Sequence, residues 1–241
     1  MRHHRGNRNL AKFCYLCTMN QKVTALRAGG LLPEPTLRRL PWYLAYLSTL
    51  NTGQETYIST TRLAEALSVD PSQIAKDLSF LGIRGKTRIG YEVTALESTL
   101  RQFLGFSTCH NAIMAGAGSL GAALMADSGL QHYGLNIVAG IDTDPAIAGT
   151  SISGVPVYQP DRLGDLVRSL DIKIGIIAVP VGAAQEVADA LVAAGVKALW
   201  NFTPTRIRIS GDTVVANTSI YSHLAVMYNR LANMGHESDS N

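Results

Sequence analysis

The sequence predicts an α/β chain in which a small, mainly helical domain precedes a doubly wound parallel sheet. Two observations carry this prediction. Between residues 36 and 81, apolar side chains recur at the three- and four-residue steps of helices. From residue 111 onward, apolar runs of strand length alternate with helix-compatible segments, which is typical of parallel strands buried on both faces.

The first helix is expected over residues 36–50, where leucines at helical steps form one buried face. These leucines are Leu37, Leu40, Leu44, Leu47 and Leu50. The segment Asn51-Thr52-Gly53 ends this helix, and Ser59 or Thr60 can cap a short second helix that runs through Leu67.

The third helix is expected from Asp70 to about Leu81. Asp70 is an N-cap acid, Pro71 occupies the first helical position, and Gln73 can reach back to the cap. The second and third helices together predict a helix-turn-helix whose third helix enters the major groove of DNA. The candidate DNA contacts on these helices are Thr60, Ser72, Gln73 and Lys76.

Residues 82–91 form a glycine-hinged stretch that carries three cations, Arg84, Lys86 and Arg88. We interpret it as a hairpin wing that completes a winged helix-turn-helix domain. Lys86 and Arg88 are expected on the same side of an extended strand, where they can contact phosphate or enter the minor groove. The structural alternative is a small helical bundle with a solvated basic loop.

A glycine-rich loop follows the apolar run of residues 111–115 and opens a helix-compatible segment that ends near Asp127. Gly116 permits a tight turn, Gly118 lets the backbone approach phosphate, and Gly121 lets the helix pack closely on the strand. The helix N-terminus then offers N–H groups and a partial positive charge to a diphosphate. The candidate cofactor-binding residues in this loop are Gly116, Ala117, Gly118, Ser119, Leu120 and Gly121.

A second apolar run, residues 135–141, ends in Asp142, which lies 21 positions past Gly121. That spacing is close to the ~20 residues expected before the acid that binds an adenosine ribose. Because an acid here repels a 2′-phosphate, Asp142 favours NAD(H) over NADP(H). Strand, glycine turn, helix, strand and acid together predict a Rossmann domain that binds NAD(H).

The alternation continues to residue 201, which indicates a parallel sheet with helices on both faces. The expected elements are a strand over 154–158, a helix over 161–170, a strand over 172–179, a helix over 183–194 and a strand over 197–201. The crevice at the carboxyl ends of these strands adds Val179 and Pro180 to the candidate cofactor contacts, with residues 201–204 as a further wall.

Residues 219–233 have the periodicity of a last helix that needs an apolar groove, either on its own sheet or in a partner subunit. Its apolar positions are Ile220, Leu224, Met227, Tyr228 and Leu231. The expected domains are a basic extension over 1–32, a winged-helix DNA-binding domain over 33–95, a Rossmann NAD(H)-binding domain over 105–215 and a dimerisation helix with a tail over 216–241.

Positive charge is concentrated at the front of the chain. The net charge is +6 in residues 1–32, +2 in residues 33–91 and −5 in residues 92–241. This gradient suits a front domain that meets a polyanion and a back domain that does not. The extension has no clear amphipathic period, so we expect it to be disordered, with Met19 as an alternative start.

Cysteine usage and hydropathy point to the cytoplasm. Cys14, Cys17 and Cys109 cannot form a disulfide framework, and one C-x-x-C pair lacks the second ligand pair of a structural zinc site. No secretory signal or membrane-spanning segment is evident. We therefore expect no metal and no membrane association.

Several motifs in one order resemble the Rex family of bacterial redox-sensing transcriptional repressors, from about Pro33 to the last helix. They are the glycine loop together with residues 37–43, 76–82, 90–91, 154–158 and 199–204. The resemblance implies a homodimer whose last helix is exchanged between subunits. It also implies an inverted-repeat operator DNA, whose binding NADH weakens and NAD⁺ permits.

The chain departs from this family at positions that bear on the switch. The resemblance places a helix-one arginine, a tyrosine after the glycine loop and an aspartate at the head of the last helix at Ala45, Asp127 and Ser219. None of the three is retained. Residues 83–85 also read Ile-Arg-Gly, where the family usually has Glu-Phe-Gly.

Three functions follow from these observations. The first is an NADH/NAD⁺-responsive repressor, in which the apolar wall at Val179 and Pro180 favours the uncharged nicotinamide of NADH. The second keeps the repressor but replaces NAD(H) with another adenine nucleotide, such as a coenzyme A ester. The third is an NAD-dependent dehydrogenase, which is disfavoured because the chain has no substrate domain and its histidines are isolated, so we expect a non-enzyme without catalytic residues.

Overall fold

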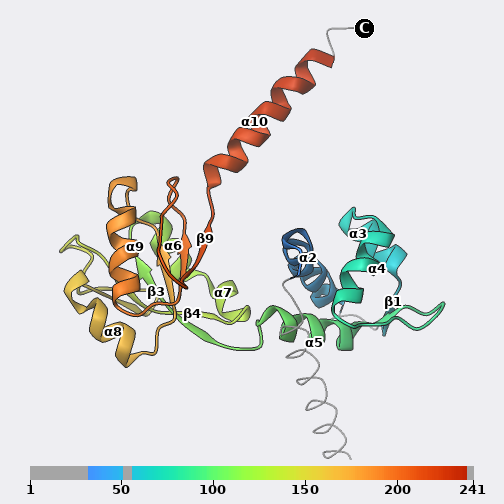
Figure 1. Cartoon of the computed structure of the whole chain (residues 1–241), viewed down its shortest axis with the longest axis horizontal. Helices are drawn as coiled ribbons and strands as arrows, with labels where there is room; N and C mark the ends of the chain where they lie inside the picture. Colours follow the sequence, from blue (N-terminus) through green and yellow to red (C-terminus); the bar gives the residue numbers. More distant parts are fainter. Residues whose placement is uncertain (1–31, 51–55, 238–241) are drawn as a thin grey trace, which may run out of the picture. The chain divides into compact units, whose positions relative to one another are not determined.

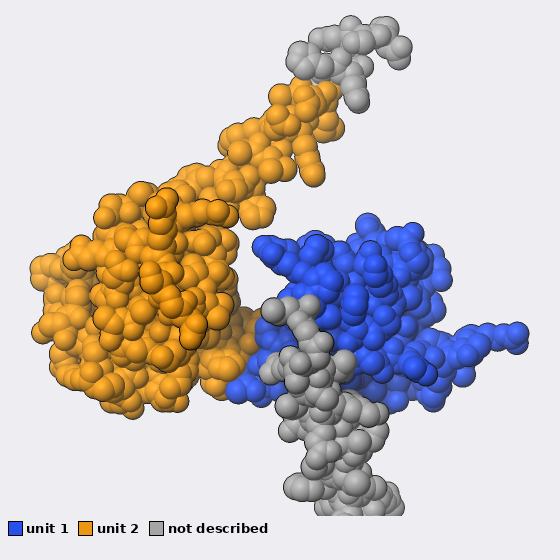
Figure 2. Space-filling view, viewed as in Figure 1, with its two compact units in different colours: residues 1–108 blue, residues 109–241 orange. Residues whose placement is uncertain are grey.

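The computed structural model describes residues 32–50 and 56–237 of the chain. Two compact units divide at residue 108, and Figure 2 colours them separately. Positions 1–31 of the expected extension, which include Cys14, Cys17 and Met19, lie outside the described residues. The expected break between the first two helices, residues 51–53, lies outside them as well.

The described part of the first unit consists of helices with a small antiparallel sheet (Figure 1). In chain order its elements are α2 (Glu34–Leu50), β1 (Tyr57–Ile58), α3 (Thr60–Leu67), α4 (Pro71–Phe80), β2 (Tyr91–Glu92) and α5 (Val93–Leu104). The strand β1 pairs with β2, so the segment between α4 and β2 is tied back to the residues before α3.

Helix α5 is part of the first unit, beyond the expected domain limit at residue 95. Its Val93, Leu96 and Leu100 are buried in one cluster with Leu44 and Leu47 of α2. The helix ends at Gly105, which adopts a left-handed conformation. The helical bundle that carries α3 and α4 is therefore closed by an element that the sequence analysis did not anticipate.

Both predicted N-caps are present in the helix-turn-helix. The Ser59 side chain accepts from Arg62 N–H and begins α3, and the Asp70 side chain accepts from Ser72 N–H and begins α4. The expectation for Gln73 is wrong. Its Nε2 donates to Asp77 Oδ1 at 2.9 Å rather than reaching back to the cap, because a buried carboxylate one turn away is the stronger acceptor.

The second unit is a seven-stranded sheet covered by helices. Its strands are β3 (His110–Ala115), β4 (Leu135–Ile141), β5 (Ser151–Ile152), β6 (Val155–Tyr158), β7 (Ile174–Ile177), β8 (Ala198–Asn201) and β9 (Val214–Asn217). Its helices are α6 (Ser119–Ala126), α7 (Ser128–His132), η1 (Pro160–Arg162), α8 (Leu163–Ser169), η2 (Val181–Ala183), α9 (Ala184–Ala193) and α10 (Ile220–Glu237).

The strand order is β5-β6-β4-β3-β7-β8-β9, with β5 antiparallel to β6 and the other pairs parallel. Without β5, this is the 3-2-1-4-5-6 order of a doubly wound dinucleotide-binding sheet. Successive residues of β3 point to opposite faces of the sheet. Ile113 packs with α8 and α9 on one face, and Met114 packs with α6 on the other. The order of the strands reverses between β3 and β7.

Two strands of this sheet were not anticipated from the sequence. The strand β5 turns back antiparallel onto β6 through Ser153 and Gly154, both at positive φ. The strand β9 pairs in parallel with β8 and is the last strand of the doubly wound order. Its four residues, Val-Val-Ala-Asn, are largely exposed, so they carry no buried-strand pattern.

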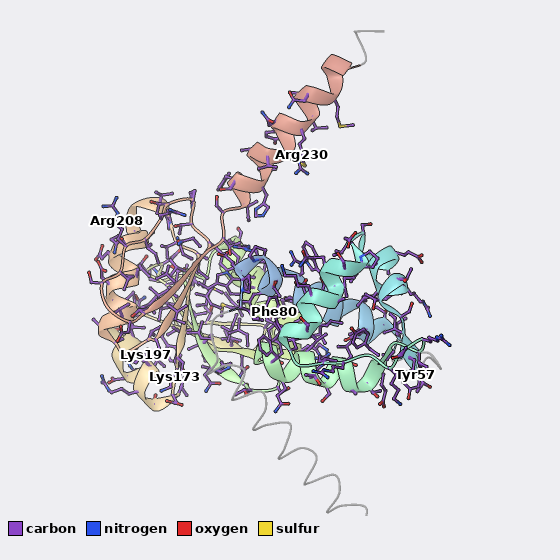
Figure 3. All side chains as sticks on the ribbon, turned by 45° about the vertical axis from the view of Figure 1, so that its right-hand side comes forward. Tyr57, Phe80, Lys173, Lys197, Arg208 and Arg230 are labelled. Carbon is purple, nitrogen blue, oxygen red and sulfur yellow. The ribbon has the colours of Figure 1, made fainter. Side chains whose placement is uncertain are left out.

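Helix α10 continues from β9 and exposes apolar side chains along its length. Tyr221 is 63% exposed, Tyr228 61%, Leu231 58% and Met234 70%. Figure 3 draws the side chains of α10, Arg230 among them, as sticks around the helix. The helix therefore does not pack these side chains on its own sheet. Among the described residues, no helix is both long and apolar enough to cross a bilayer.

Candidate functional site

The glycine loop lies at the point where the strand order reverses. Gly116 follows β3 with φ +89°, and its N–H donates to Ile141 O at 2.9 Å. A Cβ at Gly116 would lie 2.5 Å from Ala178 O and 2.9 Å from Val179 Cγ1. The loop therefore touches the segment after β7, so the structure brings Gly116 and Val179 together as predicted.

Gly121 and Gly118 have different surroundings. A Cβ at Gly121 would lie 1.9 Å from Gly116 O, so this glycine permits the close approach of α6 to the loop. A Cβ at Gly118 would meet nothing within 4 Å. Gly118 thus borders open space, and it is the N-cap of α6 without any side-chain cap. Ser119 and Leu120, which follow it, are exposed.

Asp142 closes the loop from the end of β4. Its Oδ2 accepts from Ala117 N–H at 2.7 Å, and its Oδ1 accepts from Asp144 N–H at 2.9 Å. Each carboxylate oxygen has two lone pairs, so both oxygens keep capacity for a ribose hydroxyl. Asp142 is half-buried, and its bond to Ala117 N–H orients the glycine loop.

Two aromatic rings stand at the end of β8, next to the same region of the sheet. Trp200 and Phe202 have ring centroids 4.6 Å apart and pack against the cluster that contains Ala117 of the glycine loop. The sequence analysis placed Phe202 in a wall of the crevice but assigned no role to Trp200. The sequence feature that could have identified Trp200 is its place at the carboxyl end of an apolar strand.

In the first unit, the strongest polar feature is the buried carboxylate of Asp77 on α4. Arg39 donates to it twice, from Nε at 2.7 Å and from Nη2 at 2.8 Å. Tyr43 Oη donates at 2.7 Å, Thr36 Oγ1 at 2.9 Å and Gln73 Nε2 at 2.9 Å. Asp77 thus accepts five hydrogen bonds, and four of them, from Thr36, Arg39 and Tyr43, fix helix α4 to α2.

The surroundings of Asp77 determine its charge. Burial alone raises the pKa of the carboxyl, but the hydrogen bonds from Arg39, Tyr43, Gln73 and Thr36 outweigh it and lower the pKa to about 2. Burial and the hydrogen bond to Asp77 raise the pKa of Tyr43. The sequence signal for this cluster was an acid among the apolar positions of an amphipathic helix, which must be paired to be buried.

The exposed side of α4 carries Ser72 and Lys76, as predicted, whereas Gln73 is half-buried beside Asp77. Thr60, at the start of α3, is half-buried, and Arg84 is exposed. Ser72 also donates from Oγ to Asp70, and the hydroxyl of Ser72 lowers the pKa of that cap carboxyl. The structure thus leaves Lys76 as the exposed cation of α4.

The wing is a tight turn rather than an extended strand. Lys86 N–H donates to Gly90 O at 2.8 Å, and Arg88 lies between them with φ +65°. Lys86 and Arg88 are therefore not side by side on one strand, because the turn reverses the chain at Arg88. A Cβ at Gly90 would lie 2.2 Å from Ile58 O, so close packing on β1 fixes the turn.

Lys86 is held by Tyr57 of β1, which Figure 3 labels. Its Nζ donates to Tyr57 Oη at 2.8 Å and lies 4.9 Å from the centre of the same ring. The hydrogen bond to Tyr57 raises the pKa of Lys86, so the side chain stays charged. The exposed ammonium is thereby placed at the base of the wing.

Comparison with known proteins gives matches in both units. A family model described as "Putative DNA-binding protein N-terminus" matches residues 32–79, and one described as "CoA binding domain" matches residues 108–205. The redox-sensing transcriptional repressor Rex of Bacteroides thetaiotaomicron is 50% identical over 212 residues, which are 88% of this chain and 96% of the relative. The protein of the same name from Porphyromonas gingivalis is 51% identical over 203 residues, 84% of this chain and 93% of the relative.

The chain belongs to the Rex family of redox-sensing transcriptional repressors. The crystal structure of RSP in complex with β-NAD⁺ and operator DNA matches with a TM-score of 0.82 and 32% identity, covering 87% of this chain and 97% of that one. The structure of RSP, described as a Rex-family repressor, with β-NADH matches with a TM-score of 0.78, covering 88% of this chain and all of that one. The Rex relatives are named as repressors and not as enzymes.

The three positions where the chain departs from the Rex pattern have local roles or none. Ala45 is an exposed residue of α2. Asp127 accepts from Gly129 N–H at 2.8 Å and caps α7. Ser219 Oγ accepts from Ser222 N–H at 3.3 Å at the start of α10. Within the second unit, Asp127 and Ser219 thus each serve their own helix end.

Proposed function

We propose that this chain is an NADH/NAD⁺-responsive DNA-binding transcriptional repressor, which NADH releases from operator DNA. The observation that carries the proposal is one polypeptide with both a helix-turn-helix unit and a glycine loop at the reversal point of a dinucleotide-binding sheet. The complexes of RSP with β-NAD⁺ and operator DNA and with β-NADH support it.

The residues of the second unit fit NAD(H). The space at Gly118 and the uncapped N-terminus of α6 suit a diphosphate, with Gly116, Ala117, Ser119, Leu120 and Gly121 as the surrounding loop. Asp142 suits an adenosine ribose with free hydroxyls. Val179 and Pro180 form the apolar wall proposed for the nicotinamide, which is uncharged in NADH.

For DNA, we assign phosphate and groove contacts to half-buried Thr60 at the start of α3 and to exposed residues of α4 and the wing. The exposed residues are Ser72, Lys76, Arg84, Lys86 and Arg88. Gln73 remains a candidate through the atoms of its amide that Asp77 does not engage. Cations that contact phosphate fix the register of the protein on the duplex, and α4 reads base edges in the major groove.

We infer a homodimer on an inverted-repeat operator. The exposed apolar side chains of α10 need a groove, and a second subunit supplies one if the last helices are exchanged. Two-fold symmetry of the protein then matches two half-sites on DNA. Operator DNA and NAD(H) are both found in the cytoplasm, so we place the protein there. As a repressor it is assigned no catalytic residue.

NADH releases DNA only if it binds the DNA-incompatible arrangement of the dimer more tightly than the DNA-bound one. A thousandfold loss of operator affinity requires about 4 kcal/mol of differential binding. A gel shift on the DNA upstream of the chain's own gene tests this. NADH is expected to dissociate the protein–DNA complex and NAD⁺ to leave it intact. A complex that persists at saturating NADH contradicts the proposal.

Replacing Lys86 with alanine is expected to weaken binding to all DNA sequences alike. The logarithmic salt dependence of the operator affinity should fall by about 1 for each subunit, because one phosphate contact is lost per subunit. Lys197→Ala, which removes an exposed lysine of the second unit, is the matched control and should leave the slope unchanged. An unchanged slope in the Lys86 variant would remove this residue from the interface.

A second candidate ligand is a coenzyme A ester, which the match of residues 108–205 to a CoA binding domain favours. Asp142 argues against it, because coenzyme A carries a 3′-phosphate on the ribose. Calorimetry is expected to give tighter binding for NADH than for acetyl-coenzyme A, and Asp142→Ala should lower NADH affinity by about tenfold through the lost ribose contacts. If acetyl-coenzyme A bound more tightly than NADH, the coenzyme A ester would replace NAD(H) as the proposed ligand.

A further inference from the structure

Trp200 links two regions of the second unit that the proposed function uses. Its ring contacts Phe202 and packs on the cluster that contains Ala117 of the glycine loop. If Asp142 holds the adenosine ribose, a dinucleotide bound across the crevice places its other half over β7 and β8. Phe202 directly follows β8. With the ligand in this position, Phe202 is the residue of β8's end that its other half meets, and the Trp200 ring contacts Phe202.

The indole N–H of Trp200 reaches the segment that precedes α10. Its Nε1 donates to Thr218 Oγ1 at 2.9 Å, and Thr218 is two residues before the first residue of α10. Thr218 N–H in turn donates to Asn201 O at 2.8 Å. Thr218, the residue after β9, is thus held by β8 through one backbone bond and one side-chain bond.

The backbone around this link is held by several hydrogen bonds, whereas the side-chain link from Trp200 is one hydrogen bond from a half-buried ring. Asn201 is fully buried. Its Nδ2 donates to Thr205 O at 2.7 Å and to Asn217 Oδ1 at 2.9 Å, and its Oδ1 accepts from Thr203 N–H and Oγ1. With β8 and β9 fixed in this way, the indole is the group that can transmit a change at Phe202 to Thr218.

We propose that Trp200 is a positioning residue that couples occupancy of the nucleotide crevice to the start of α10, through the hydrogen bond from its indole N–H to Thr218. This inference rests on the proposed repressor function. It gives the chain a connection between ligand and α10 that does not use Ala45, Asp127 or Ser219. A shift of the Phe202 ring moves the indole, and the bond to Thr218 changes the direction in which α10 leaves β9.

Two variants remove the same bond from opposite ends. Trp200→Phe keeps an aromatic ring against Phe202 without the N–H, and Thr218→Val keeps the shape of threonine without the hydroxyl. The measured quantity is the ratio of operator dissociation constants with and without saturating NADH, together with the dissociation constant of NADH itself. Thr150→Val removes a threonine hydroxyl elsewhere in the unit, where it donates to Ile147 O, and serves as the control.

Each variant is expected to lower the NADH-dependent ratio by about fivefold, the magnitude of one ordinary hydrogen bond, while NADH affinity changes by less than about twofold. The double variant should equal either single variant, because both remove one interaction. The control should match the wild type. Only a coupling role lowers the ratio at unchanged NADH affinity; a purely structural role does not.

Wild-type ratios in both variants overturn the inference, as does an effect in Trp200→Phe that Thr218→Val does not share, because the ring and not the bond would then be responsible. Loss of NADH affinity in parallel with the ratio also overturns it. A wild-type protein that NADH does not release overturns the proposed function itself, and with it this inference, so the two failures are distinguished by the wild-type measurement.

Discussion

Asp77→Asn is expected to destabilise the first unit by about 3 to 5 kcal/mol and to abolish operator binding. The amide replaces one of the two oxygens that accept from Arg39 with an N–H₂ group, which cannot accept, and it leaves a guanidinium without its carboxylate partner. Helix α4, which carries the proposed DNA contacts, loses its polar attachment to α2. Urea unfolding of the full chain measures this loss of stability.

The chain's two tryptophans assign the loss to one unit, because Trp42 lies in the first unit and Trp200 in the second. With Trp200→Phe as background, fluorescence follows only the first unit, and with Trp42→Phe it follows only the second. Asp70→Asn is the matched control on the same helix. It alters an exposed cap and should cost at most about 1 kcal/mol. Equal costs for the two variants would contradict the role of Asp77.

The same carboxylate predicts how stability depends on pH. The pKa of Asp77 is about 2 in the folded chain and lies near its ordinary value of 3.8 when the chain is unfolded. Because the folded value is the lower one, the contribution of Asp77, about 2 kcal/mol, is fully present above pH 4 and is lost as the pH falls toward 2. The stability difference between wild type and Asp77→Asn should therefore shrink over that range.

Gly118→Ala is expected to lower NADH affinity by at least about tenfold without affecting the fold. Gly118 has a negative φ of −66°, which alanine adopts, and a Cβ there meets no protein atom within 4 Å. The new methyl group occupies the space that a diphosphate needs for close approach to the backbone. We expect calorimetry to show the loss of NADH binding and the operator complex to persist at NADH concentrations that release the wild type.

Gly121→Ala is the contrasting variant, because its Cβ would lie 1.9 Å from Gly116 O. Backbone must move to accept it, so the second unit should lose about 1 to 3 kcal/mol of stability as well as NADH affinity. Thermal unfolding separates the two variants. If Gly118→Ala binds NADH as tightly as the wild type, the diphosphate is not bound at this loop.

Local signals were sufficient for much of the second unit. The strand β4 has the bounds that its apolar run predicted, Leu135–Ile141, and the glycine loop lies between β3 and α6 as expected. In the first unit, Ser59 and Asp70 cap their helices because side-chain capping depends on residues within one turn. Each of these features is decided by neighbours in the sequence.

Features that depend on distant residues were not predicted. Asp77 is a buried acceptor for Gln73 because Arg39 and Tyr43 of α2 pair with it. Arg88 sits in a turn because Gly90 packs on Ile58 of β1. Helix α5 was missed although Val93, Leu96 and Leu100 have helical spacing, since their partners lie on α2. The apolar side chains of α10 are exposed rather than packed on their own sheet, and the helical periodicity alone did not decide between these arrangements.

Calorimetric titration of NADH into the protein, free and saturated with operator DNA, tests the central claim most directly. If NADH binding and operator binding oppose each other, NADH must bind the DNA-bound protein more weakly than the free protein. The factor must equal the one by which NADH weakens operator binding. The account predicts that equality. Equal NADH affinity in both states, with DNA retained throughout, would contradict it.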